Sequence, residues 1–171
     1  PTVTLVSPVS GSTFVAPASF VLSASAADAD GMIVRTEFFQ SAVRIGEDLV
    51  APYEQAVTGL AAGTYTFVAR AHDNQASAAE PAPITVTVVS PNQPPVVGLT
   101  APADGAVYAA PAVVTLAATA SDPDGSVARV EFLQDAMKIG EAGAAPFTMT
   151  WTQVPPGAYV LTARAYDNLG A

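Results

Sequence analysis

The sequence predicts an all-β protein: two antiparallel β-sandwiches in tandem, the second lacking its last strand. Residues 1–77 align without a gap on residues 95–171, and 32 of the 77 pairs are identical. Short segments rich in β-branched residues alternate apolar with polar side chains, and no segment keeps the 3.6-residue period of a helix. Turn signals separate these segments at intervals of about 8–12 residues, which is typical of a sandwich.

The repeat sets the domain organisation. Its offset of 94 positions is the size of a whole small β domain, which is too long for a solenoid repeat. We therefore predict one sandwich over residues 1–89, a linker over 90–95 and a second sandwich over 96–171. The linker reads Ser-Pro-Asn-Gln-Pro-Pro, and its prolines favour an extended, stiff connection with the modules end to end.

The strands follow from the alternation pattern. In the first module we expect them near 2–7, 18–27, 33–40, 43–48, 54–58, 64–72 and 83–89. In the second we expect them near 96–101, 112–121, 127–134, 137–141, 147–151 and 158–166. The counterpart of 83–89 is absent, so an edge of the second sandwich should be unpaired and its core open. Two explanations stay open: the sequence is a piece of a longer polypeptide, or another chain donates the strand by β-augmentation.

Strand parity predicts the core. The inward positions are Val34, Thr36, Phe38, Tyr65, Phe67, Ala69 and Ala71, with Ala128, Val130, Phe132, Tyr159, Leu161, Ala163 and Ala165 as their counterparts. The segments 62–65 and 156–159 predict a tyrosine corner, in which the ring packs inside and the hydroxyl caps upstream backbone. Arg35, Glu37 and Arg70 should point outward and form cross-strand ion pairs on a solvated face.

Composition excludes several functions. The net charge of −9, with a single lysine, would repel nucleic acid. The absence of cysteine excludes a disulfide or a thiolate metal site. No apolar run reaches about 18 residues, so no membrane span is expected. The chain begins at Pro1 and is interpreted as an excerpt of a longer or processed polypeptide.

Calcium is the sharpest chemical hypothesis. Two matched sets of aspartates are candidate ligands: Asp28, Asp30 and Asp73 in the first module, and Asp122, Asp124 and Asp167 in the second. The loops that carry them should lie at one end of each sandwich, and the linker should bring Asn92 close to the second set. Carboxylate and amide oxygens suit Ca²⁺, which takes six to eight oxygen ligands. The alternative is a purely structural Asp-x-Asp-Gly turn, with aspartates accepting backbone N–H bonds and glycine at positive φ.

Catalysis is not expected, and no cofactor is required. The only histidine, His72, aligns with Tyr166 and is interpreted as a surface residue. No cysteine nucleophile and no Gly-x-Ser-x-Gly motif occurs. Trp151 aligns with Val57, which suggests a core position. Phe39 and Leu133 should point outward as a small apolar patch, the candidate contact for a glycan or protein partner.

Several short motifs recur in the same order in both halves. They are Pro-x-x-Gly (8–11, 102–105), Asp-x-Asp-Gly (28–31, 122–125), Glu-Phe (37–38, 131–132), Ile-Gly-Glu (45–47, 139–141) and Ala-Arg-Ala-x-Asp-Asn (69–74, 163–168). This order resembles that of bacterial immunoglobulin-like domains of exported multi-domain proteins. The resemblance implies two Ig-like sandwiches that serve as a non-enzymatic spacer, stalk or adhesive module.

The same resemblance implies where the chain works and with what. The place would be a secreted, cell-surface or filament-associated protein. The partners would be further Ig-like modules of the same polypeptide or of neighbouring subunits, or else a glycan or a surface protein. The aspartates near Asn92, and not the resemblance, predict a calcium ion at the junction, which would stiffen the pair in a way similar to cadherin-like repeats. The alternatives are an adhesion or carbohydrate-binding module, and a fibre subunit assembled by strand donation.

Overall fold

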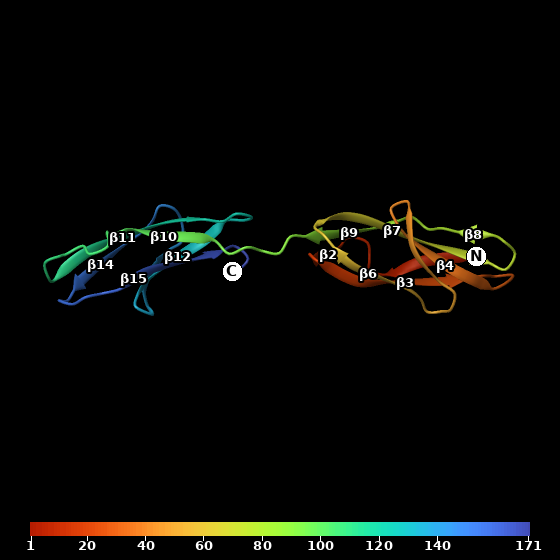
Figure 1. Ribbon diagram of the computed structural model, residues 1–171, viewed down its shortest axis with the longest axis horizontal. Coiled ribbons are helices and arrows are strands. Elements are labelled where there is room, and N and C mark those ends of the chain that lie inside the picture. The colour runs from red at the N-terminus through yellow and green to blue at the C-terminus, as the bar shows by residue number, and fades with distance from the viewer. The chain divides into compact units, whose positions relative to one another are not determined.

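The computed structural model describes all 171 residues and contains only β-strands as regular elements (Figure 1). The chain divides into two compact units, Pro1–Pro91 and Asn92–Ala171, here called unit 1 and unit 2. None of its segments is a helix long and apolar enough to cross a membrane. The predicted all-β fold class is confirmed.

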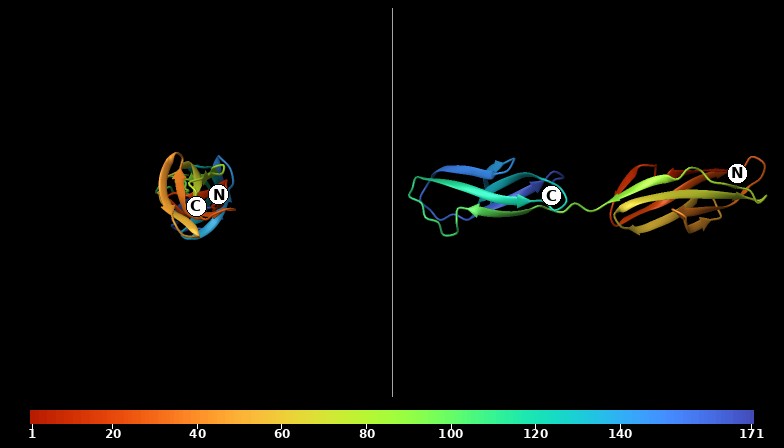
Figure 2. Two further views of the ribbon diagram at one scale, coloured as in Figure 1. Left: turned by 90° about the vertical axis from the view of Figure 1, so that its right-hand side faces the viewer. Right: turned by 90° about the horizontal axis from the view of Figure 1, so that it is seen from above.

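Unit 1 is a complete two-sheet sandwich. Its strands are β1 (Thr2–Ser7), β2 (Ser12–Val15), β3 (Ala18–Ala27), β4 (Ile33–Gln40), β5 (Val43–Asp48), β6 (Tyr53–Leu60), β7 (Gly63–Asp73), β8 (Ala78–Ala79) and β9 (Ile84–Val89). One sheet has the order β1-β3-β6, and the other has the order β2-β9-β7-β4-β5 with β8 paired to β7. The two layers can be followed in Figure 2. All pairs are antiparallel except β2 with β9, which is parallel.

Unit 2 repeats six of these strands. They are β10 (Val96–Ala101), β11 (Ala112–Ser121), β12 (Val127–Gln134), β13 (Met137–Ala142), β14 (Phe147–Val154) and β15 (Leu161–Asp167). The sheets have the orders β10-β11-β14 and β13-β12-β15. The counterparts of β2 and of the start of β7, residues 106–109 and 157–160, form no strand. In unit 1 both segments pair with β9, which has no counterpart in unit 2.

Each unit has its own apolar core. Phe38, Phe67, Leu22 and Val86 are fully buried in unit 1, and Phe132, Leu116 and Val130 are fully buried in unit 2. The positions of β4 and β12 that were predicted to face the core are buried, except the first one of each strand. Val34 and Ala128 are exposed because the register with β7 and β15 shifts there, between Ile33 and Arg35 and between Val127 and Arg129. Such a bulge turns one side chain away from the face that alternation assigns to it.

Candidate functional sites

The loops after β3 and β7 of unit 1 lie together. The N–H of Met32 donates to Asn74 Oδ1 at 3.0 Å, which ties one loop to the other. The backbone nitrogen of Pro1 lies 3.5 Å from Asp28 Oδ2 and 3.9 Å from Asp73 Oδ2. Two of the three predicted carboxylates of this unit therefore approach the same point, beside the start of β1.

The same carboxylates also accept local backbone hydrogen bonds. Asp28 Oδ1 accepts the N–H of Asp30 at 3.0 Å, and Asp73 Oδ1 accepts those of Gln75 and Ser77 at 2.8 Å. The hydrogen bonds from the backbone and carboxyl of Asp30 lower the pKa of Asp28 to about 2. The hydrogen bond between the two carboxyl groups and the negative charge of Asp28 raise the pKa of Asp30. Asp28 is therefore the stronger acid of the two.

The aspartates of unit 2 accept local backbone hydrogen bonds in the same way, and two residues of the linker donate further ones. Asp122 Oδ1 accepts the N–H of Asp124 at 3.2 Å. Asn92 Nδ2 donates to Asp167 Oδ2 at 2.6 Å, and the N–H of Gln93 reaches Asp124 Oδ2 at 3.2 Å. Burial acts to raise the pKa of Asp167, but the hydrogen bonds from Asn92 and the following backbone outweigh it and lower that pKa.

The predicted calcium ligands are not all gathered at one point. No group of three histidine, cysteine, aspartate or glutamate side chains is placed to hold a metal ion, and Asp30 and Asp124 are exposed. Asp28 Oδ2 and Asp122 Oδ2 are buried and have no hydrogen-bond partner. A buried carboxylate oxygen without a donor is costly, so these two atoms are where a cation would be most favourable.

The glycine of each Asp-x-Asp-Gly turn has a different role from the one predicted. Neither Gly31 nor Gly125 has a positive φ. A Cβ on Gly125 would lie 2.7 Å from Asn168 Oδ1 and 2.8 Å from Asp122 Oδ2, and one on Gly31 would overlap Asn74 Oδ1. Glycine is required because the asparagine from the neighbouring loop approaches the backbone closely, which no local turn signal reveals.

The charged face of unit 1 is only partly as predicted. Glu37 is buried and is contacted by His72 Nε2 at 2.9 Å, Arg44 Nη1 at 3.3 Å and Arg35 Nε at 3.5 Å. Burial acts to raise the pKa of Glu37, but the hydrogen bond with His72 and the charges of Arg35 and Arg44 together lower it. Arg70 does not pair with Glu37. Its Nη2 instead lies 2.6 Å from Oε2 of a second glutamate, Glu80.

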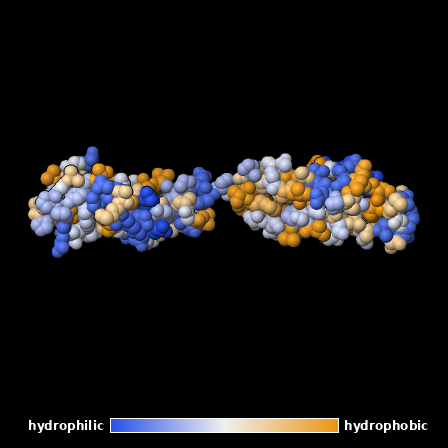
Figure 3. Space-filling model, turned by 90° about the horizontal axis from the view of Figure 1, so that it is seen from below, coloured by the Kyte–Doolittle hydropathy of each residue, from blue (hydrophilic) through white to orange (hydrophobic).

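The predicted apolar patch at Phe39 and Leu133 does not exist as an exposed surface. The guanidinium of Arg70 lies 5.0 Å from the centre of the Phe39 ring and covers it. Leu133 is buried. Register shifts in the pairing of β4 with β5 and of β12 with β13 occur at these residues, and strict alternation cannot anticipate them. On the face shown in Figure 3, apolar and hydrophilic residues are interspersed over both units.

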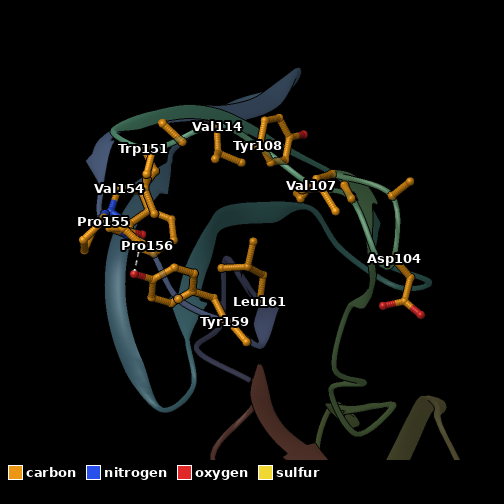
Figure 4. Close-up of a pocket in the computed structure, with 18 of the residues that line it drawn as sticks. Asp104, Val107, Tyr108, Val114, Trp151, Val154, Pro155, Pro156, Tyr159 and Leu161 are labelled. Carbon is orange, nitrogen blue, oxygen red and sulfur yellow. Dashed lines mark hydrogen bonds between the residues drawn. The ribbon is translucent and has the colours of Figure 1, made fainter.

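The open edge of unit 2 holds a pocket of about 630 Å³. Trp151 packs edge-to-face on Tyr159 with ring centres 5.1 Å apart, and both rings line the pocket together with Tyr108 (Figure 4). The Tyr159 hydroxyl donates to the carbonyl of Pro155 at 2.9 Å, so the predicted tyrosine corner is confirmed. In unit 1 the Tyr65 hydroxyl makes the same bond to the carbonyl four residues upstream, at 3.0 Å.

Several known proteins are similar to this chain. The fibronectin(III)-like modules of Clostridium thermocellum CbhA are 33% identical to the chain, with a TM-score of 0.52, and the match covers 99% of this chain and 88% of theirs. Bacteroides ovatus SGBP-B of the mixed-linkage glucan utilization locus, solved with a mixed-linkage heptasaccharide, is 14% identical with a TM-score of 0.38, over 100% of this chain and 45% of that one. Curated proteins gave no significant match. A family model described as bacterial Ig domain matches residues 1–69 and again 95–163, and the chain therefore belongs to the bacterial Ig domain family.

Proposed function

We propose that the chain is a non-enzymatic structural or spacer segment of an exported bacterial protein of the cell surface or of a filament. The observation that carries the proposal is which residues occur in both copies. Three features that hold the sandwich together are repeated. They are the tyrosine corner, the asparagine that accepts an N–H from the neighbouring loop (Asn74 and Asn168), and the ion-paired glutamate (Glu37 and Glu131). The single histidine, by contrast, is not repeated, since His72 has Tyr166 as its counterpart.

A spacer needs a stiff joint as well as stable domains. Three of the six residues 90–95 are proline, and proline-rich segments behave as semi-rigid spacers. Asn92 and Gln93 are in addition bound to carboxylates of unit 2, which shortens the part of the linker that is free to bend.

The stiffness of the joint can be measured by spin labelling, since the chain has no cysteine of its own. Cysteines at the exposed positions Val50 and Met137 would carry the labels. We expect a narrow distribution of inter-label distances, and a clearly broader one when Pro91, Pro94 and Pro95 are all replaced by serine. Equally broad distributions in both proteins would contradict a spacer function.

We also propose that Ca²⁺ binds at the loop end of unit 2. The proposal rests on the buried, unpartnered Oδ2 of Asp122. The side chains that would hold the ion are Asp122, Asp167 and Asn92, with backbone carbonyls and water completing the shell.

The calcium prediction is tested by thermal unfolding. We expect millimolar Ca²⁺ to raise the melting temperature of unit 2 relative to chelator, because a ligand of the native state stabilises it by mass action. Asp122→Asn should abolish the increase. Asp104→Asn, on an exposed turn outside the loop end, is the matched control and should leave it unchanged. A melting temperature that does not depend on Ca²⁺ would show that calcium has no structural role.

Adhesion to a glycan or a protein is the alternative function. Its predicted surface, the patch at Phe39 and Leu133, is covered or buried. The aromatic residues that remain available are the exposed Tyr108 and the half-buried Trp151 and Tyr159, which line the pocket of unit 2.

A further inference from the structure

Each three-stranded sheet ends in an edge strand, β6 in unit 1 and β14 in unit 2. Both strands are eight residues long and pair on one side only, with β3 and with β11. An unpaired edge presents a row of N–H and C=O groups to which another strand can be added, and most proteins protect it. The two edges can be compared position by position, because these two sheets consist of the same three strands in both units.

Unit 1 protects the edge of β6 with side chains. Asp48, at the end of β5, accepts the N–H of Glu54 through Oδ2 at 3.0 Å. Gln55 Nε2 donates to the carbonyl of Ala56 at 2.8 Å. Glu54 also places a negative charge on the edge strand, and charged side chains are a common protection against strand addition. The N–H of Glu54 points away from β3, and the backbone groups of Ala56, two residues further on, point the same way.

Unit 2 lacks each of these protections. The three residues that provide them in unit 1 have uncharged counterparts without an amide: Asp48 corresponds to Ala142, Glu54 to Thr148, and Gln55 to Met149. The side chain of Met149 lies beside Gly140 of β13, as that of Gln55 lies beside Gly46 of β5. The side chain thus keeps its place between the two sheets, but it has no group that could donate to the edge of β14.

The sequence of β14 is also of a type that favours strand pairing. It reads Phe-Thr-Met-Thr-Trp-Thr-Gln-Val, with no charged residue, no glycine and no proline. Uncharged segments of high β-propensity readily add to another strand when they lie on an exposed edge. Thr148, Thr150 and Thr152 are exposed. Thr148 and Thr150 are the counterparts of Glu54 and Ala56, so the backbone groups of all three threonines point toward the open edge.

We propose that β14 is an association site at which it pairs antiparallel with β14 of a second copy of this chain. A two-fold axis at Thr150 sets this residue opposite its own copy and Thr148 opposite Thr152. On the inner side of the sheet, Met149 lies opposite Trp151. Threonine therefore meets threonine on the outer face, and apolar residues meet on the inner face.

A second copy suits this edge because the edge is self-complementary. Under the two-fold axis, each outward N–H of β14 meets a carbonyl of the same strand in the other copy. The net charge of −9 opposes self-association at charged surfaces, but β14 contributes no charge. Pairing ends at Gln153, where the backbone is left-handed and the register with β11 shifts. The inference goes beyond the spacer function and does not rest on it.

Sedimentation equilibrium of the whole chain, up to millimolar concentration, tests the proposal. We expect a monomer–dimer equilibrium. Thr150→Lys should weaken the dimer at least about tenfold, because it sets two ammonium groups opposite each other on the two-fold axis. Ala56→Lys, at the counterpart position of β6, is the matched control and should leave the dissociation constant unchanged. Ala142→Asp combined with Met149→Gln, which gives unit 2 two of the protections of unit 1, should weaken the dimer as Thr150→Lys does.

Disulfide trapping then tests register and direction, since the chain has no cysteine of its own. Thr150→Cys should form a disulfide-linked dimer on mild oxidation, because the Cα atoms of a hydrogen-bonded antiparallel pair are about 5.5 Å apart. Thr148→Cys alone should not, because its two copies would lie roughly 14 Å apart. A mixture of the Thr148→Cys and Thr152→Cys variants should give cross-linked pairs of one chain of each.

Three results would overturn the proposal. The first is a folded chain that stays monomeric at millimolar concentration. The second is a dimer that Thr150→Lys leaves unchanged or that Ala56→Lys weakens equally. The third is equal cross-linking of the Thr148→Cys and Thr150→Cys variants, which would mean contact without a fixed register. Melting curves followed by Trp151 fluorescence verify that unit 2 is folded in each variant. A narrow or broad inter-label distance across the linker has no bearing on any of these outcomes.

Discussion

At the scale of single residues, the two copies have different residue types at two matched positions where the backbone is left-handed. Gly59 in unit 1 has a φ of +70°, and its counterpart Gln153 has a φ of +56°. Ala76 has a φ of +66°, and its counterpart Gly170 has a φ of +98°. Each copy thus has glycine at one of the two positions and a side chain at the other. A side chain in this region costs about 1–2 kcal/mol, partly offset by the greater flexibility of an unfolded glycine.

We therefore expect Ala76→Gly and Gln153→Gly each to stabilise the protein by about 0.5–1 kcal/mol. Urea unfolding measures the change. The reverse exchange, Gly59→Ala, should destabilise the protein by a similar amount even though a Cβ there meets no atom within 4 Å. A loss of stability on Ala76→Gly or Gln153→Gly would mean that backbone strain at these positions is negligible.

Residue-level prediction from the sequence worked where a side chain acts within its own strand or turn. The tyrosine corner was identified correctly because ring and acceptor are four residues apart. The role of Gly125 was not, because Asn168 comes from a loop more than 40 residues away. The burial of Glu37 and its contact with His72 likewise depend on pairing between β4 and β7.

At the scale of elements, the clamp between two loops of unit 2 can be tested directly. Asn168 Oδ1 accepts the N–H of Ser126 at 3.0 Å and lies against Gly125. We expect Gly125→Ala to destabilise unit 2 by about 1–3 kcal/mol, since the added methyl group displaces this side chain. Gly143→Ala is the matched control, because a Cβ at that position meets nothing within 4 Å, and its effect should stay within about 0.5 kcal/mol.

The result is read from denaturant unfolding of the whole chain, followed by Trp151 fluorescence so that unit 2 is observed. Equal effects of the two alanine substitutions would show that Asn168 moves aside at no cost. The loops would then not be clamped, and the repeated glycine would have no packing role.

Strand prediction succeeded where alternation alone decides the structure. β1, β3, β4 and β5 have the predicted bounds, and β6, β7 and β9 differ from them by one or two residues. β2 was missed, and residues 106–109 explain why: without a β9 partner, the same stretch of the repeat forms no strand. Whether this segment is a strand is decided by a partner about 70 residues away and not by its own sequence.

At the scale of the whole molecule, acidic groups control how stability depends on pH. Local hydrogen bonds and cationic neighbours lower the pKa of Asp28, Glu37 and Asp48 in unit 1, and of Glu131 and Asp167 in unit 2. A carboxyl whose folded pKa is lowered stabilises the protein above its unfolded pKa of about 4, and this contribution is lost as the pH falls through the folded value. Asp30, whose pKa is raised, acts in the opposite direction.

We expect the melting temperature of both units to be nearly constant above about pH 5 and to fall steadily below about pH 4.5. The decrease should continue toward pH 2 in unit 1, because the pKa of Asp28 is lowered to about 2. Calorimetry at a series of pH values measures it, with Glu37→Gln and Glu131→Gln as a matched pair. Each substitution should reduce the fall in melting temperature at low pH of its own unit only, since the two glutamates belong to separate units. If each substitution reduced the fall in both units, or if the wild-type melting temperature did not fall between pH 5 and pH 2, the hydrogen-bonded carboxylates would not be what sets the acid stability of this protein.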